Sequence, residues 1–285
     1  MAFQKETWQS LLHAWENSRE AYEQRIQIPK DTEPPSDGRT EIIMTKSNYI
    51  CTCGIDMTEY AKLFTYASLS EDTCAVTGYT GSEPASLLIP EHDPEGRVVV
   101  AIGDRAFANH TALRAVTLPD SVEVIGTRAF AFCTGLLDIR FSSESRLASI
   151  GNRAFMGCER LTVLRFGRLH DLVNLGRSAF AYCTRLRSVV LPEGLCELAP
   201  SLFEGCTALE HICLPQTLTT IRTGAFSACT ARRVLSLPGS VRIIEQCAFA
   251  WCGHLTDLRL PESTCMIAAS AFMDCVALED VLKVG

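Results

Sequence analysis

Ala129-Phe130-Ala131-Phe132-Cys133-Thr134-Gly135-Leu136 is one copy of a phrase, Ala-Phe-x-x-Cys-x-x-Leu, that returns through most of the chain. Subtracting their numbers shows that its phenylalanines stand 23 or 25 residues apart: Phe107, Phe130, Phe155, Phe180, Phe203, Phe226, Phe249 and Phe272. A fixed period of this length is typical of a solenoid, in which each repeat forms one rung and neighbouring rungs share a core. The sequence therefore predicts a repeat solenoid with eight stacked phenylalanines.

The residues around Phe130 predict the form of one rung. Residues 113–119 alternate like a strand, with Val116 and Leu118 inward, and Pro119 marks where pairing ends because proline has no N–H to donate. Residues 121–125 are predicted to form a second, shorter strand. We expect residues 126–133 to form a helical turn that directs Ala129 and Phe130 into the core. The expected fold class is therefore an α/β repeat solenoid.

Three segments are predicted along the chain. Residues 1–30 hold an amphipathic helix, because apolar residues recur at helical spacings over 3–28 before Pro29 stops it. Residues 31–62 are expected to be a linker and irregular chain. Residues 63–285 form the repeat domain of about eight repeats, and four short strands within 63–103 form an N-terminal β cap and the first rung.

The apolar face of the predicted N-terminal helix has two interpretations. It docks on the solenoid and hides the first edge, or it binds a partner or a second copy of the chain. The residues that would mediate self-association are Trp8, Leu11, Leu12 and Trp15. Exposure of two tryptophans to water is unfavourable, which favours docking.

Charge and hydropathy exclude several classes of protein. The net charge of −7 is spread evenly, with −4 on residues 1–71 and −3 on residues 72–285, which argues against the broad basic surface that nucleic acid requires. No apolar run is long enough for a spanning helix. The first residues lack the features of a secretory signal, so the cytosol is the expected compartment.

Half of the 14 cysteines occupy one repeat position, three residues after the phenylalanine. These seven residues, called the cysteine column here, are Cys133, Cys158, Cys183, Cys206, Cys229, Cys252 and Cys275. Rungs about 4.8 Å apart would allow a ladder of disulfides, but stacked side chains point the same way rather than toward each other. Buried thiols that fill a tight turn are the favoured interpretation.

The sequence contains no complete motif of catalysis or metal binding. Cys51 and Cys53 could form half of a zinc site, with Cys74 and His92 as distant candidates, or a redox pair. A zinc site needs a second ligand pair at a recognisable spacing, and the sequence has none. We therefore expect no metal, no cofactor and no enzymatic activity.

Recognition is expected at the outward residues of the longer strand of each rung, because a solenoid offers an extended surface there. The candidate partner-binding residues are Asp138, Arg140, Val163, Arg165, Ser188, Val190, His211, Asp257 and Arg259. In a stack, Arg140 lies above Arg165, and two valines make an apolar strip. A second column, Arg105, Arg128 and Arg153, is expected on the opposite side, either solvated or matched by acidic groups.

A longer phrase, Leu-Pro-x-Ser-Val-x-x-Ile-Gly-x-x-Ala-Phe-x-x-Cys-x-x-Leu, fits residues 118–136, 191–209 and 237–255 best. It resembles the BspA-like leucine-rich repeat family, over residues from about 63 to 285. The resemblance implies a curved, right-handed superhelix with one strand per rung on its concave side and no catalytic residues. It also implies a surface or secreted location, since members occur there and some are adhesins.

The expected function combines these inferences. It is a non-catalytic scaffold that binds a protein partner on the concave face. The alternatives are a surface adhesin for host or matrix proteins, and a structural protein that self-associates through the N-terminal helix.

Overall fold

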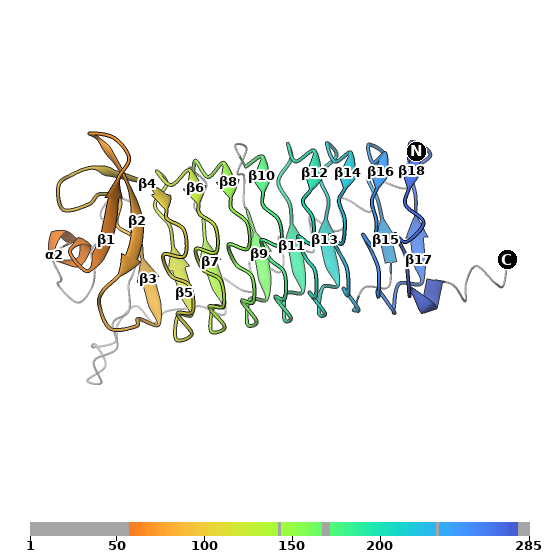
Figure 1. Cartoon of the computed structure of the whole chain (residues 1–285), viewed down its shortest axis with the longest axis horizontal. Helices are drawn as coiled ribbons and strands as arrows, with labels where there is room; N and C mark the ends of the chain where they lie inside the picture. Colours follow the sequence, from red (N-terminus) through yellow and green to blue (C-terminus); the bar gives the residue numbers. More distant parts are fainter. Residues whose placement is uncertain (1–56, 142–143, 167–171, 232–233, 279–285) are drawn as a thin grey trace, which may run out of the picture. The chain divides into compact units, whose positions relative to one another are not determined.

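The structure, a computed structural model, describes residues 57–141, 144–166, 172–231 and 234–278. They belong to the second of the two units into which the chain divides, Ile55–Gly285. This unit is a β-solenoid of about eight turns, and each turn lies beside the one before it (Figure 1). The predicted helix over 3–28, with Trp8, Leu11, Leu12 and Trp15, lies outside the described residues and stays a prediction.

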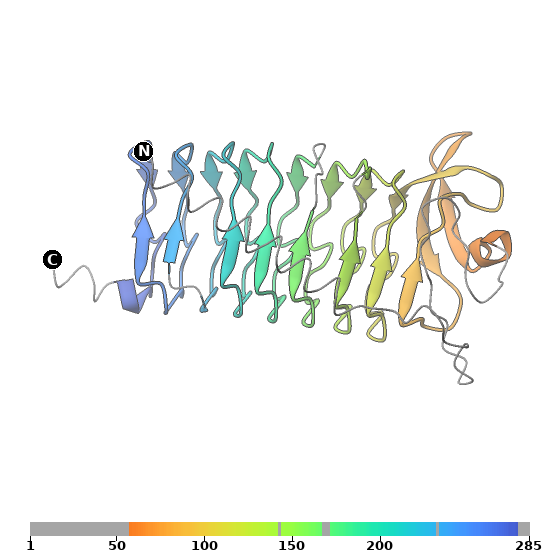
Figure 2. The same cartoon turned by 180° about the vertical axis from the view of Figure 1, so that it is seen from behind.

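Two kinds of strand alternate along the repeats, and Figure 2 shows them from the other side. The three-residue strands are β3 (Ser86–Leu88), β5 (Ala115–Thr117), β7 (Asp138–Arg140), β9 (Val163–Arg165), β11 (Ser188–Val190), β13 (His211–Cys213), β15 (Val234–Ser236) and β17 (Asp257–Arg259). The two-residue strands are β6 (Val124–Ile125), β8 (Ser149–Ile150), β10 (Asn174–Leu175), β12 (Glu197–Leu198), β14 (Thr220–Ile221), β16 (Ile243–Ile244) and β18 (Met266–Ile267). Both strands predicted for each rung are therefore present.

Strands of successive rungs pair in parallel, and the ladders fall into blocks. The three-residue strands form the sheets β3-β5-β7, β9-β11-β13 and β15-β17. The two-residue strands continue a sheet β1-β2-β4-β6-β8-β10 and form a second one, β12-β14-β16-β18. The block boundaries fall at different rungs on the two sides, so each pair of neighbouring rungs keeps a ladder on at least one side.

The phenylalanines of the repeat stack in single file through the core. From Phe107 to Phe272, successive ring centroids lie 5.2 to 5.9 Å apart in stacked geometry. The rings from Phe107 to Phe249 are at most 2% exposed, while Phe272 in the last rung is partly buried. The predicted stack of eight rings is confirmed.

The segment that follows the second strand of a rung, residues 126–133 in the rung of Phe130, is not a helical turn, and that prediction is wrong. Arg128 and Phe132 have φ values of 57° and 60°, and the equivalent positions repeat this in the other rungs. A right-handed helix needs negative φ throughout. The N–H of Phe130 instead donates to the carbonyl of Ala154 in the next rung, at 2.8 Å. The fold is thus a β-solenoid with very little helix, and α/β is the wrong class.

The chain before the repeats adds three longer strands, β1 (Phe64–Ser68), β2 (Thr73–Tyr79) and β4 (Val98–Ile102). β2 and β4 are parallel and continue the sheet of the two-residue strands, and β1 pairs antiparallel with β2 at its edge. A separate cap is therefore not supported. The short helix α2 (Met57–Ala61) lies where irregular chain was expected. The ring centroids of its Tyr60 and of Phe64 are 5.4 Å apart.

Truncation of a central ring tests the phenylalanine stack. Phe155→Ala should lower the free energy of unfolding by about 3–5 kcal/mol, because it leaves a cavity between two stacked neighbours. Phe272→Ala is the matched control and should cost clearly less, since that ring is partly exposed. Denaturant titration measures both, and equal losses would contradict a dominant role for the buried stack.

Candidate functional site

The predicted partner-binding residues all lie on the three-residue strands. In β7, β9 and β11 the middle residue is buried and the two flanking residues are at least partly exposed. Parallel pairing then sets outward residues beside each other, as Val163 beside Ser188 and Ser188 beside His211. We call the outward residues of β5 to β17 the strand face.

The structure groups five of the nine predicted residues in one sheet. The block β9-β11-β13 contains Val163, Arg165, Ser188, Val190 and His211. Asp138 and Arg140 belong to the preceding sheet, and Asp257 and Arg259 to the following one. The middle sheet is therefore the most continuous part of the strand face.

Two of the three predicted arginines have a carboxylate partner in their own strand. Arg140 Nε lies 2.8 Å from Asp138 Oδ2, and Arg259 Nε lies 3.5 Å from Asp257 Oδ2. Arg165 is exposed and forms no ion pair with a described residue, and in register it lies beside the exposed Val190. The i,i+2 spacing on one strand face could have revealed both pairs in the sequence.

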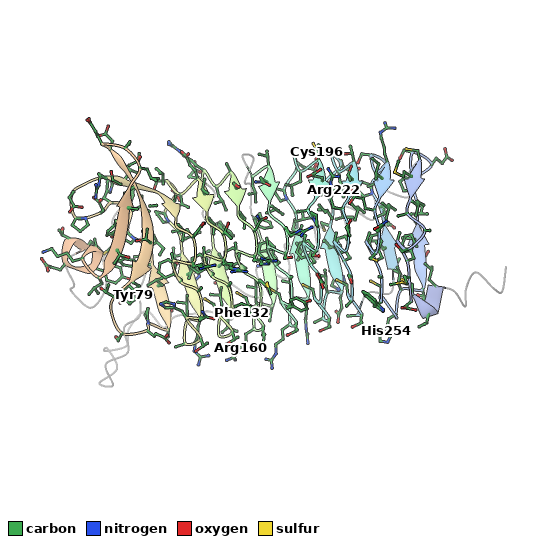
Figure 3. All side chains as sticks on the ribbon, viewed as in Figure 1. Tyr79, Phe132, Arg160, Cys196, Arg222 and His254 are labelled. Carbon is green, nitrogen blue, oxygen red and sulfur yellow. The ribbon has the colours of Figure 1, made fainter. Side chains whose placement is uncertain are left out.

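Exposed aromatic residues lie directly before the cysteine column in the turn, and the sequence pattern did not predict them. Phe132, Tyr182 and Trp251 are 44%, 45% and 48% exposed, and each has φ near 60°. Figure 3 shows Phe132 at this turn. A Cβ added to Gly157 would lie 2.7 Å from the Phe132 ring, and one added to Gly205 would lie 2.6 Å from the Tyr182 ring. The rings of Phe132 and Tyr182 therefore cover the glycines of the following rungs.

Arg222, also labelled in Figure 3, joins three successive rungs. Its guanidinium lies 2.6 Å from Glu197 Oε2 and 2.7 Å from Glu245 Oε1. Glu245 also accepts a hydrogen bond from the N–H of Thr223, at 2.9 Å. Arg222 is thus neutralised from both neighbouring rungs and has a structural role.

The column Arg105, Arg128 and Arg153 differs from Arg222 in its surroundings. The three residues occupy the same position in successive rungs, and none forms an ion pair with a described residue. Unit charges about 5 Å apart repel by on the order of 1 kcal/mol in water. Arg105 is exposed, and Arg128 and Arg153 are partly exposed, which favours a solvated column over one matched by acidic groups.

Charge is not spread evenly along the rungs, which corrects the expectation drawn from the net charges of residues 1–71 and 72–285. Residues 100–190 carry 12 arginines and seven carboxylates, a net charge of +5. Residues 191–278 carry five arginines and eight carboxylates, a net charge of −3. The first rungs therefore form a basic zone in an acidic chain.

The cysteine column consists of buried thiols, as the favoured interpretation predicts. Each Sγ donates to the backbone carbonyl of the phenylalanine one rung earlier, at 3.0 to 3.3 Å. Burial raises the pKa of Cys133 and of Cys183 to about 12, so both stay protonated donors at neutral pH. The alternative of a disulfide ladder is wrong.

Thiol labelling tests this arrangement. We expect a maleimide to modify the exposed Cys196 and Cys265 quickly, and to modify the cysteine column only after unfolding, because a buried protonated thiol is a poor nucleophile. Peptide mapping by mass spectrometry identifies each labelled site. Rapid labelling of Cys158 in the folded protein would contradict the prediction.

Metal ligands do not cluster in the part of the chain that the structure describes. Cys74 is buried and its thiol donates to the carbonyl of Arg97, at 3.7 Å, which accounts for it without a metal. Cys51 and Cys53 lie outside the described residues, so their proposed pairing stays a prediction.

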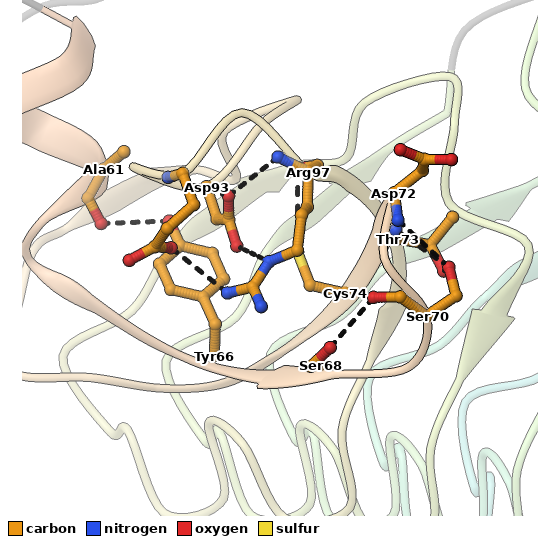
Figure 4. Close-up of polar contacts among 10 residues, drawn as sticks. Ala61, Tyr66, Ser68, Ser70, Asp72, Thr73, Cys74, Asp93 and Arg97 are labelled. Carbon is orange, nitrogen blue, oxygen red and sulfur yellow. Dashed lines mark hydrogen bonds and ion pairs between the residues drawn. The ribbon is translucent and has the colours of Figure 1, made fainter.

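The loop between β3 and β4 is held by one buried carboxylate (Figure 4). The Asp93 side chain is fully buried, and Arg97 Nε lies 2.6 Å from its Oδ2. The N–H groups of Glu95 and Arg97 donate to Oδ1, at 3.0 and 2.8 Å. Burial alone would raise the pKa of Asp93, but the hydrogen bonds from Arg97 outweigh it and lower the pKa below its ordinary value.

We predict that the contribution of Asp93 to the free energy of unfolding is lost in acid. Asp93→Asn should destabilise the protein by about 1–3 kcal/mol at pH 7, because a charged acceptor is lost. The lowered pKa means that the stabilisation is present above the unfolded-state pKa of about 3.9 and is lost as pH falls through the folded-state value. The difference in Tm between the two proteins should therefore shrink below pH 4. Asp72→Asn, at an exposed position, is the control, and a constant difference would contradict the prediction.

These features define the class of protein, a leucine-rich-repeat solenoid with an extended strand face. A family model described as BspA type leucine rich repeat region, in six copies, matches residues 100–233 and 149–279. Because these matches cover more than half of the 285 residues, the chain belongs to this family. A search of curated proteins finds no significant match.

Solved structures of bacterial leucine-rich repeat proteins are similar to the chain. The leucine rich repeat protein of T. pallidum is 28% identical with a TM-score of 0.56, over 79% of this chain and 92% of that one. One from Bacteroides capillosus is 29% identical with a TM-score of 0.38, over 46% and 95%. A leucine rich cell surface protein from Faecalibacterium prausnitzii is 20% identical with a TM-score of 0.33, over 76% and 92%.

Proposed function

We propose that the chain is a scaffold without catalytic activity that binds a protein partner on the strand face. The observation that carries this proposal is the middle sheet, β9-β11-β13. There Arg165, exposed and without an ion pair to a described residue, lies in register beside the exposed Val190. Protein interfaces favour arginine because its charged, planar group and its apolar stem both make contacts.

The construction of the rungs supports a recognition role for these residues. The buried middle residues, Leu164 and Val189, maintain the core, so the outward residues can change without loss of the fold. Several short strands side by side then offer a surface wide enough for another protein. The remaining predicted residues, Asp138, Arg140, Asp257 and Arg259, would lie at the two ends of the contact.

Adhesion is the second candidate, and membership of the BspA-type family favours it. In this case the partner would be a host or matrix protein, and the chain would lie at a cell surface. No helix among the residues that the structure describes could cross a membrane. Self-association through the N-terminal helix stays a separate prediction, because that segment lies outside the described residues.

Charge reversal tests the strand face. The double variant Arg140→Glu/Arg165→Glu should weaken binding of the native partner at least tenfold and leave Tm nearly unchanged, because both side chains are exposed. A partner isolated with the wild-type protein is titrated against both proteins. Arg146→Glu/Arg160→Glu makes the same charge change at exposed residues off the strand face. Unchanged affinity of the first variant, or equal losses in both, would reject the assignment.

A further inference from the structure

Arg105, Arg128 and Arg153, the arginine column, share one backbone conformation in three successive rungs. Each has φ of 57°, and the N–H of Arg128 donates to the carbonyl of Asn152 in the next rung, at 2.9 Å. Equal conformation at equal positions sends the three side chains in the same direction from the turn. Rungs are about 4.8 Å apart where strands pair across them.

The fold does not explain why arginine occupies this position. A left-handed backbone favours glycine, asparagine or aspartate, and arginine gains nothing from it. The following four rungs have smaller, uncharged residues there: Ser178, Ser201, Gly224 and Cys247. Arg222 is held between two carboxylates, whereas the arginine column has no ion pair to any described residue. The backbone N–H of each column arginine donates to the next rung, which accounts for the left-handed backbone. The like-charge repulsion between the three side chains is offset by no ion pair with a described residue.

We propose that the arginine column is a binding site for the anionic groups of a sulfated polysaccharide. Residues 100–278 contain 17 arginines and no lysine, which favours ligands with planar or tetrahedral oxyanions that accept two hydrogen bonds from one guanidinium. The basic zone of residues 100–190 surrounds the column and raises the local concentration of an anion. This site is separate from the strand face and adds to the proposed function.

The spacing of the column favours a polysaccharide over other polyanions. Side chains on one side of an extended peptide are about 6.6 Å apart, which does not match a rung spacing of about 4.8 Å. A sulfated polysaccharide carries several anionic groups on each sugar, so its charges can follow a closer spacing. Nucleic acid needs a broad basic surface, whereas the column ends after three rungs and residues 191–278 carry a net charge of −3.

Replacement of the column by the residue found in later rungs gives a direct test. Arg105→Ser/Arg128→Ser/Arg153→Ser should keep the fold, because Ser178 and Ser201 already occupy this position. The full chain is titrated with dextran sulfate, with unsulfated dextran and with polyglutamate. We expect the wild-type protein to bind dextran sulfate in a salt-sensitive manner, and the triple variant to bind it at least tenfold more weakly with Tm equal or higher.

The control variant Arg114→Ser/Arg187→Ser/Arg242→Ser removes the same charge from exposed positions outside the column and should weaken binding of dextran sulfate clearly less than the column variant does. Absence of wild-type binding to dextran sulfate would overturn the proposal. Equal losses in the two triple variants would overturn it as well, because they would show a general charge effect. Equal binding of polyglutamate or of unsulfated dextran would also reject a sulfated polysaccharide as the ligand.

Discussion

Each rung can bury its own core only by lying on the next one, and the rest of the structure depends on this contact. A single phenylalanine is worth about 1.5–3 kcal/mol when it is buried, but a rung of 23 or 25 residues has no second layer to cover the ring. The neighbouring rungs supply both covering faces, and every second backbone N–H group of the turn donates to the next rung. The cysteine column adds a thiol donor to the same contact.

Two left-handed residues in each turn from Arg105 to Trp251 make this contact possible. They direct alternate N–H groups along the solenoid axis, so that Phe130 donates to the next rung while Ala129 and Ala131 donate within their own turn. The side chains at these two positions point away from the core, so the residue type there can differ from rung to rung. The arginine column and the exposed aromatics Phe132, Tyr182 and Trp251 occupy these positions.

Much of the rung was predictable from the sequence because its period and its inward residues repeat. The strands, the stacked rings and the outward direction of Arg140 and Arg165 follow from that pattern. The turn did not, since Ala-Phe-x-x-Cys-x-x-Leu also has the spacing of a helix face, and only the φ values distinguish the two. The contacts of Arg222 with Glu197 and Glu245 depend on side chains from three rungs, which no single repeat displays.

The sheets of the three-residue strands and those of the two-residue strands end at different rungs. Where β7 and β9 belong to different sheets, β6 and β8 still pair, and where β10 and β12 separate, β11 and β13 pair. A pull along the axis therefore meets hydrogen bonds at each junction between the rungs that the structure describes, besides the stacked rings. No junction between these rungs lacks strand pairing on both sides, so we expect a mechanical load to be shared along the solenoid rather than to separate two particular rungs.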